Sequence, residues 1–506
     1  MHQSRRPLTG LCALLTLTPL LTACFAASGT DTNAGSSSRL RVALARPPAQ
    51  ALSPLSNDAT VLGKLSVAEG LTVLDANGSA APALATSWVR KDATTWTFEL
   101  RKATFHDGTA FTAESVVASL GHAAAAKVKP RVLSDVTLTA KAEDADTVTI
   151  STSPADPVLP MRLASHELGI FAAKAYGQDG TVTPVGTGTG AFKITKLTGK
   201  SSVTLDRFDG YWGGRAKSAG IDVTWIVDGS ARANALRSGE VDIAEWIPAS
   251  QAKLLNEDMR HEVSSVRTDS LLLNTGDGIF ADPSLRAAAR SALDSSAVVG
   301  PIFAGHADPA QGLFGPAVTW AGGLRVAVTG RADAASVADV KAKTQGRTVR
   351  LAAITNRAEL PEVATVVQQQ LEKAGFTVQQ DIRETAQLEP DLLAGKYDAL
   401  VFSRVTLLDT GDAVAYLASD FTSSGTYNIA RLKDARVDQA IAAAAQESDT
   451  AQRQQKIMLA EAEILRTDAA VPLVHEKVVQ GFSPRVEGVV LDPRERTLIT
   501  TGTHLK

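Results

Sequence analysis

Short apolar segments of two kinds run through the chain and predict a mixed α/β protein. Residues 40–44, 95–100, 136–140 and 147–151 alternate apolar and polar positions, which is typical of strands buried on one face. Residues 62–71 instead read as a helix. The first third of the chain is therefore expected to contain both element types.

Two helix starts carry capping signals. Thr112 is a good N-cap, Glu114 lies in the first turn that follows it, and Leu120 lies on the predicted inner face. Asp282 followed by Pro283 combines a capping acid with a proline at the first helical position. Both patterns predict helices that begin directly after the capping residue.

The last third predicts a βαβ unit. Residues 348–354 form the first strand, residues 361–374 the helix that ends at Gly375, and residues 376–380 the second strand. Such a connection is expected to be parallel and right-handed. Further strands are expected at 191–194, 203–205, 222–227, 271–274, 397–402, 471–474 and 489–490. Further helices are expected at 231–238, 391–394, 437–446 and 451–467.

The N-terminus has the order of a secretory signal. Basic residues are followed by an apolar stretch and then by small residues that end at Cys24, so residues 1–23 are expected to be a signal peptide. This ending resembles a bacterial lipobox, which implies that the Cys24 thiol is acylated. Residues 24–38 are rich in Gly, Ser, Thr and Asn and predict a flexible tether. An ordinary signal with an incidental cysteine is the alternative, and Arg5–Arg6 leaves Sec and twin-arginine export both open.

Length and composition narrow the class of protein. A chain of 506 residues is too long for one compact core, so two or three lobes are expected. The formal net charge of −3 does not favour nucleic-acid binding. Cys12 and Cys24 are the two cysteines, and Cys12 lies in the signal, so no disulfide is expected in the mature chain.

The sequence contains only weak signals of catalytic motifs. The glycines at 186, 188 and 190 precede a predicted strand, whereas a dinucleotide site needs a following helix, so they are interpreted as a tight bend. The eight histidines do not form a short-spaced metal motif, and no Gly-x-Ser-x-Gly elbow occurs. His106 beside Asp107 is interpreted as a structural turn neighbour. The sequence therefore predicts neither an enzyme nor a cofactor or metal site.

Several phrases nevertheless resemble one family, and they occur in that family's order. They are residues 105–117 (Phe-His-Asp-Gly-Thr onwards), 188–193, 211–214 (Tyr-Trp-Gly-Gly), 236–243 and 285–294. On these motifs the chain resembles the extracytoplasmic solute-binding proteins of bacterial ABC importers, family 5, of the peptide, oligopeptide and nickel type.

The resemblance implies an architecture. It implies an α/β, two-lobed periplasmic-binding-protein fold (type II, cluster C), with two crossing strands and an extra subdomain in the first lobe. On that template, lobe I comprises residues 39–75, 187–275 and 475–506, the extra subdomain residues 76–186, and lobe II residues 276–474.

The resemblance also implies binding residues in the segment that begins at Tyr397. Peptide-binding relatives carry an acid there that holds the α-ammonium group, and by position Asp409 is the first choice and Asp412 the second. Arg404 either binds a ligand carboxylate or neutralises Asp409, and both acids can equally be plain loop residues. Trp246 could line the pocket, and Asn274 ends the first crossing strand near the hinge.

The expected function is solute capture without chemistry. The chain is predicted to be a monomer, lipid-anchored at the outer face of the cell membrane, that delivers a peptide-like solute to an ABC permease. A nickel chelate or an oligosaccharide is the alternative solute. A peptide-binding receptor or chaperone lipoprotein and a secreted hydrolase are the rival classes.

Overall fold

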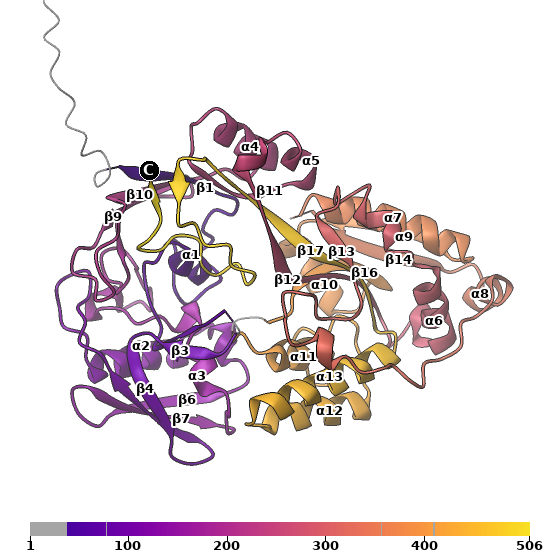
Figure 1. The fold of residues 1–506 in the computed structure, drawn as a ribbon. Helices are drawn as coiled ribbons and strands as arrows, with labels where there is room; N and C mark the ends of the chain where they lie inside the picture. The colour runs from indigo at the N-terminus through magenta and orange to yellow at the C-terminus, as the bar shows by residue number, and fades with distance from the viewer. Residues whose placement is uncertain (1–37, 77, 356, 408–409) are drawn as a thin grey trace, which may run out of the picture. The chain divides into compact units, whose positions relative to one another are not determined.

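The computed structural model describes residues 38–76, 78–355, 357–407 and 410–506. One sheet, eleven-stranded among these residues, has the order β15-β14-β16-β12-β17-β11-β1-β10-β9-β8, and β13 pairs with β17 (Figure 1). Its strands are β1 (Arg39–Leu44), β8 (Phe192–Thr198), β9 (Ser202–Arg207), β10 (Gly220–Trp225), β11 (Ile243–Ile247), β12 (Arg260–Leu273), β13 (Ala307–Pro309), β14 (Thr348–Ile354), β15 (Thr377–Arg383), β16 (Ala399–Val405) and β17 (Ala470–Phe482).

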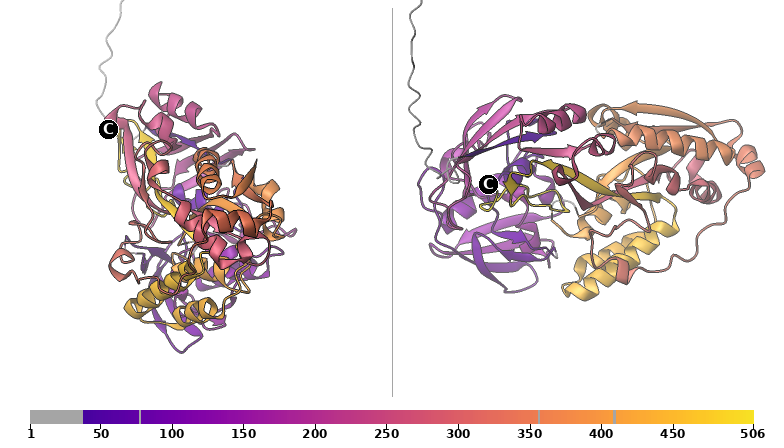
Figure 2. Two further views of the ribbon diagram at one scale, coloured as in Figure 1. Left: turned by 90° about the vertical axis from the view of Figure 1, so that its right-hand side faces the viewer. Right: turned by 45° about the horizontal axis from the view of Figure 1, so that its top comes forward.

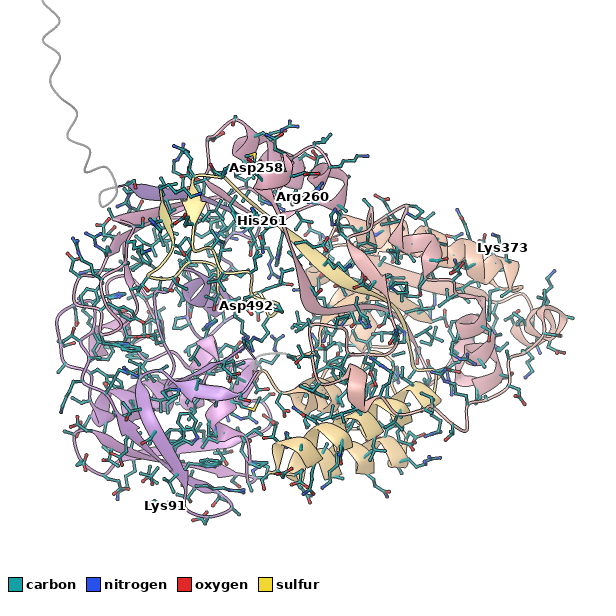
Figure 3. The ribbon with its side chains drawn as sticks, viewed as in Figure 1. Lys91, Asp258, Arg260, His261, Lys373 and Asp492 are labelled. Carbon is teal, nitrogen blue, oxygen red and sulfur yellow. The ribbon has the colours of Figure 1, made fainter. Side chains whose placement is uncertain are left out.

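Two long strands, β12 and β17, connect the halves of this sheet. They pair antiparallel from Arg260↔Gly481 to Leu272↔Ala470, and the register shifts between Ser264 and Thr268 and again after Asp269. At one end, His261 of β12 stacks on Phe482 of β17 with ring centroids 3.5 Å apart (His261 is labelled in Figure 3). These are the two crossing strands that the resemblance implied, and they join the elements on either side (Figure 2, right).

The first lobe packs around β1, β8, β9 and β10. Its core includes Leu40, Val42, Phe192 and Ile221, all fully buried. Its remaining elements are α1 (Ala59–Lys64), α4 (Gly229–Arg237), α5 (Ala249–Ala252), β18 (Val486–Glu487) and β19 (His504–Leu505).

A separate apolar core defines the extra subdomain. A four-stranded antiparallel sheet in the order β4-β5-β7-β6 packs against α2, which begins as predicted after Thr112 in a capping box with Ser115. Its elements are β3 (Ala80–Pro82), β4 (Ala85–Arg90), β5 (Thr95–Leu100), α2 (Ala113–Ala125), β6 (Thr137–Ala142), β7 (Thr147–Ser153) and α3 (Leu159–Arg162). β2 (Thr72–Leu74), which lies within the predicted bounds of lobe I, pairs with β3 in a separate two-stranded sheet.

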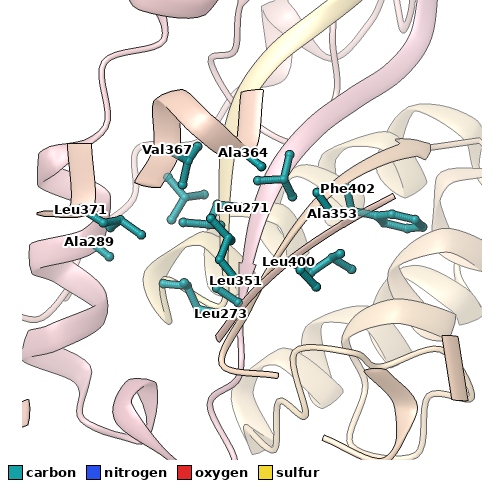
Figure 4. Packing of buried hydrophobic residues seen from close by; sticks show 14 of the residues in the cluster. Leu271, Leu273, Ala289, Leu351, Ala353, Ala364, Val367, Leu371, Leu400 and Phe402 are labelled. Atoms are coloured by element: carbon teal, nitrogen blue, oxygen red, sulfur yellow. The ribbon is translucent and has the colours of Figure 1, made fainter. Parts of the chain in front are cut away.

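The second lobe contains the predicted βαβ unit. β14 and β15 pair in parallel, and the apolar stripe of α9 packs on the sheet beside Leu271 and Leu351, as Figure 4 shows for Val367 and Ala364. Leu400 of β16 points to the opposite face of the sheet. Asp282 caps α6 as expected by accepting from the amide of Ser284. The helices are α6 (Pro283–Ala292), α7 (Ser296–Val299), α8 (Val337–Thr344), α9 (Glu359–Lys373), α10 (Thr385–Leu393), α11 (Ala413–Phe421), α12 (Ala435–Gln446) and α13 (Thr450–Arg466). Short 3-10 helices lie at Arg131–Leu133, His166–Leu168, Ala173–Ala175, Glu257–Met259, Ile279–Ala281 and Gly322–Leu324.

Two expectations about secondary structure are wrong. The helix predicted over 62–71 ends at Lys64, because Ser66 adopts a left-handed φ of 51° and cannot continue it. Residues 489–490 are not a strand, and the short strand β18 precedes them at Val486–Glu487.

The glycine segment 186–190 explains why the chain bends after α1. The carbonyls of Ser66 and Val67 accept from the amides of Phe192 and Gly190. A Cβ atom on Gly190 would lie 2.1 Å from the carbonyl oxygen of Ser66, so only glycine permits this approach. The glycines therefore serve backbone packing, in agreement with the structural interpretation, and not nucleotide binding.

Candidate functional site

Trp246 is held in an unusual backbone conformation at the end of β11. Its φ is 50°, in the left-handed region, and the β11–β17 register shifts between Ala244 and Ile247. A non-glycine residue in this region costs about 1–3 kcal/mol, and such strain is concentrated at functional sites. The indole nitrogen is buried and has no hydrogen-bond partner. Trp246 therefore has a strained backbone conformation, and this conformation sets the direction of its side chain.

Four cationic side chains surround the Trp246 ring. The distances from the charged group to the ring centroid are 4.6 Å for Arg46, 4.9 Å for Lys64, 5.8 Å for Arg357 and 5.9 Å for Arg267. They come from the segment after β1, from α1, from the segment after β14 and from β12. Cations within about 6 Å of an indole face are attracted by its electron-rich surface. We call these five residues the Trp246 platform.

Three of the four cations have carboxylate partners. Lys64 pairs with Glu245, Arg357 pairs with Glu476, and Arg267 pairs with Glu495 at 2.8 Å. These three carboxylates are buried. Burial by itself raises the pKa of Glu245, but the charge and hydrogen bond of Lys64 outweigh it, so the pKa is lowered. In the same way Arg267 outweighs burial and lowers the pKa of Glu495 to about 2.

Arg46 differs from the other three cations. Among the described residues, no carboxylate lies within ion-pair distance of its guanidinium group, and part of its side chain is exposed to solvent. Desolvation by the surrounding protein, followed by repulsion from Arg267, lowers its pKa. The platform therefore carries a positive charge that the described part of the protein leaves uncompensated and that a bound anion can reach.

Two cavities adjoin Arg46 and are lined by both lobes. The larger, of about 650 Å³, is lined among others by Arg46, Trp246 and Arg357. The smaller, of about 360 Å³, lies against Arg46 and Lys64 of the first lobe and Arg404 of the second. The lining of the smaller cavity contains seven arginine or lysine side chains and three acidic ones. Its charge and its position between the lobes suit a small anion.

Arg404 lies in the smaller cavity, but its own partner is Asp420. Its Nε and Nη2 atoms each lie 2.7 Å from a different carboxylate oxygen of Asp420, which is a bidentate pair. Burial raises the pKa of Asp420 although Arg404 opposes this. The guanidinium group also lies 4.7 Å from the centroid of Tyr427. Sequence reasoning missed Asp420, because a strand residue and a helix residue sixteen positions apart share no periodic signal.

Two other predicted site residues, Asp412 and Asn274, do not line the cavities beside Arg46. Asp412 forms a buried ion pair with Arg453 of α13, and this leaves it no free charge for an ammonium group. The side-chain amide of Asn274 donates to Asp277 Oδ1 at 3.0 Å and to the carbonyl of Tyr397 at 3.1 Å, and Asn274 lines neither cavity. Asp409 lies outside the described residues, as does Cys24.

Two buried acids, Asp269 and Glu476, lie on the crossing strands β12 and β17. Asp269 of β12 is fully buried, and neither of its carboxylate oxygens has a hydrogen-bond partner. Burial, and next the nearby Glu476, raise the pKa of Asp269 well above its ordinary value, so the protonated form is favoured. Glu476 itself is held by Arg357 and by the hydroxyl of Ser403.

Metal binding and membrane crossing receive no support from the described residues. They contain no group of three or more His, Cys, Asp or Glu side chains arranged to hold a metal ion. His106 Nε2 lies 2.9 Å from the carbonyl oxygen of Gly190, and burial lowers its pKa to about 4, as suits a structural residue.

In the part of the chain that the structure describes, none of the helices is both long and apolar enough to cross a membrane.

Two α/β lobes, two crossing strands and a charged cleft between the lobes define the class of solute-binding proteins. The sequence model for "Bacterial extracellular solute-binding proteins, family 5 Middle" matches residues 79–428, and the chain belongs to this family. Its members are extracytoplasmic substrate-binding proteins of ABC transporters and not enzymes, which confirms the expected family and the expectation that the chain is not an enzyme.

Similar proteins support this assignment. The glutathione-binding protein GsiB of Escherichia coli (strain K12) is 27% identical over 443 residues, covering 84% of this chain and 86% of GsiB. The structure of NikA from Staphylococcus aureus in complex with Ni(L-His)2 has a TM-score of 0.78 at 22% identity, covering 93% of this chain and 100% of that one. DppA from Helicobacter pylori in complex with the peptide STSA has a TM-score of 0.75 at 18% identity, covering 93% and 98%. The predicted two-lobed α/β fold is thereby confirmed.

Proposed function

We propose that this chain captures a small, peptide-like anion between its lobes and delivers it to an ABC permease. The observation that carries the proposal is Arg46, a cation of the cleft without a carboxylate partner among the described residues. A ligand carboxylate placed against it would form charge-assisted hydrogen bonds in a site that is partly shielded from water. A neutral oligosaccharide would leave this charge uncompensated, so the charge argues against that alternative.

The arrangement of charges also suggests how binding is coupled to closure. Arg46 belongs to the first lobe, and Ser403 and Arg404 line the same cavity from the second lobe. A solute that contacts both sides favours the closed form over the open form. Shifting the two forms from 1:99 to 99:1 requires about 5.5 kcal/mol of differential binding. We propose that the permease receives the solute from the closed form.

A metal chelate is the second candidate solute. A chelator that carries several carboxylates would suit the same excess of positive charge in the smaller cavity. GsiB, NikA and DppA are described as binding glutathione, a nickel–histidine complex and a peptide, respectively, and all three ligands carry carboxylates.

Calorimetric titration with short peptides tests the proposal. We expect di- or tripeptides with a free carboxylate to bind, and amidation of that carboxylate to weaken binding about 10-fold or more. N-acetylated peptides test the proposed role of Asp409, because acetylation removes the ammonium group that it would hold. Binding of polycarboxylate chelates but not of peptides would favour the second candidate. If neither the peptides nor the chelates bind, the proposed capture of such a solute is refuted.

We also propose that the mature chain is a monomer tethered to the outer face of the cell membrane through Cys24. Replacing Cys24 with alanine is expected to move the protein from the membrane fraction to the soluble fraction, since it removes the acylated thiol. Cys12→Ala is the matched control, because it changes the other cysteine and should leave fractionation unchanged. Membrane association that survives in Cys24→Ala would exclude the anchor. Permease genes beside this one would favour import over a receptor role.

A further inference from the structure

A third cavity lies between the extra subdomain and the second lobe. It has a volume of about 250 Å³ and is lined by Trp88 and Trp96 of the subdomain and by Trp320 of the second lobe. Met161, Val318 and Ile457 add to its apolar surface. Asp412, the second choice for a ligand-binding acid, also lines this cavity, but its ion pair with Arg453 leaves it no free charge for that role. The sequences of β4 and β5 alone do not reveal that their tryptophans line a cavity together with the second lobe.

The charged side chains that line this cavity are already paired. Asp412 and Arg453, which line it, neutralise each other. The indole nitrogen of Trp96 donates to the carbonyl of Asp156. Trp88, Trp96 and Trp320 are only half-buried, so aromatic surface remains accessible to an incoming group. Among the described residues, the chemistry of the cavity therefore favours an uncharged apolar group over a second anion.

The size of the cavity limits which apolar groups fit into it. An empty apolar cavity of ~150 Å³ is large enough to bind benzene. A volume of about 250 Å³ therefore accommodates a phenyl or an indole group. Tryptophan side chains offer faces and edges against which such a ring packs favourably.

The third cavity adjoins the anionic cleft. Arg494 lines both this cavity and the 360 Å³ cavity that contains Arg46. Two contacts hold the Arg494 side chain in place: its Nη1 donates to the carbonyl of Asp75, and its Nε lies 3.4 Å from the carboxylate of Asp492. Asp492 is labelled in Figure 3. One side chain thus separates the position expected for a ligand carboxylate from an apolar pocket.

We infer that the cavity lined by Trp88, Trp96 and Trp320 is an apolar subsite that takes an aromatic group. For the transported solute this rests on the proposed function, and it defines the substrate class as an anion with an aromatic substituent. A ring inserted here contacts the subdomain and the second lobe together and so adds to the stability of the closed form.

The first experiment uses indole as the probe and requires no transport ligand. Saturation-transfer NMR on the full-length protein is expected to show indole contacting the protein. Ala317→Phe fills the cavity from a half-buried lining position and should abolish the signal. Ala338→Phe is the matched control on the exposed face of α8 and should retain it. Equal signals in the two variants would overturn the inference. Trp320→Ala, which removes one wall, serves as the second variant if Ala317→Phe does not fold.

The second experiment extends the subsite to the solute. Among peptides that bind, exchanging one glycine for phenylalanine is expected to raise affinity about 10-fold, and Ala317→Phe should cancel this gain. An identical affinity for both peptides in the wild-type protein would contradict the inferred substrate class while leaving solute capture intact. Failure of every peptide to bind would instead count against the proposed function, and the indole experiment would still decide the subsite.

Discussion

Replacing Lys64 with methionine is expected to destabilise the protein by about 3–5 kcal/mol, the penalty for leaving a buried carboxylate without its partner. Side-chain exposure is 8% for Lys64 and 4% for Glu245, so water cannot replace the lost charge. Burial then raises the pKa of Glu245 without opposition from Lys64. Calorimetric and denaturant unfolding measure the effect.

Two further variants separate the lost ion pair from the loss of a side chain. Adding Glu245→Gln to Lys64→Met removes the stranded charge and keeps an acceptor for the amide of Ala45, so much of the stability should return. Lys102→Met removes the lysine of a solvent-exposed pair with Asp146 and should change stability little. A Lys64→Met protein as stable as Lys102→Met would show that the buried pair does not stabilise the first lobe.

Replacing Arg46 with alanine is expected to weaken binding of a carboxylate-bearing solute about 10- to 100-fold, the range for a hydrogen bond to a charged group. The side chain lines both cavities of the cleft, and among the described residues it pairs with no carboxylate. Its removal therefore takes a contact from the solute without stranding a protein charge. Isothermal titration calorimetry on the purified protein measures the change.

A double-mutant comparison makes the assignment specific. The amidated solute should bind wild-type and Arg46→Ala protein almost equally, because it lacks the group that Arg46 would hold. Arg90→Ala is the matched control, since Arg90 also lies over a tryptophan ring, 5.8 Å from Trp96, but lines none of the cavities. Additive losses from amidation and from Arg46→Ala would place the carboxylate elsewhere.

Local patterns predicted most elements of the fold. The βαβ unit from β14 to β15, the caps at Thr112 and Asp282 and the hairpin of β4 and β5 all follow from residues close together in the chain. The helix expected over 62–71 failed for a nonlocal reason. The carbonyls of Ser66 and Val67 accept from the amides of Phe192 and Gly190, about 120 positions later, and that contact leaves no local signal. The boundaries of the lobes stay predictions.

The candidate site was less predictable than the fold. Trp246 and Arg404 were expected near the ligand, and they line the two cavities beside Arg46. Asp412 and Asn274 were named for the same reason, but their side chains are engaged by Arg453 and by the backbone near Tyr397. Position relative to a family motif indicates which strand end faces the cleft, whereas it does not indicate which acids already have a cationic partner.

Membership of the solute-binding family and the mixed α/β architecture could be predicted from the sequence, because periodicity, caps and short motifs depend on residues that are neighbours along the chain. The distribution of charge in the cleft could not be predicted in this way. Arg46 meets Trp246 two hundred positions away, and three of the four cations around that ring are neutralised by carboxylates from distant segments. Which cation remains to meet a solute depends on these pairings, and they exist only once folding has brought the segments together and excluded water from between them.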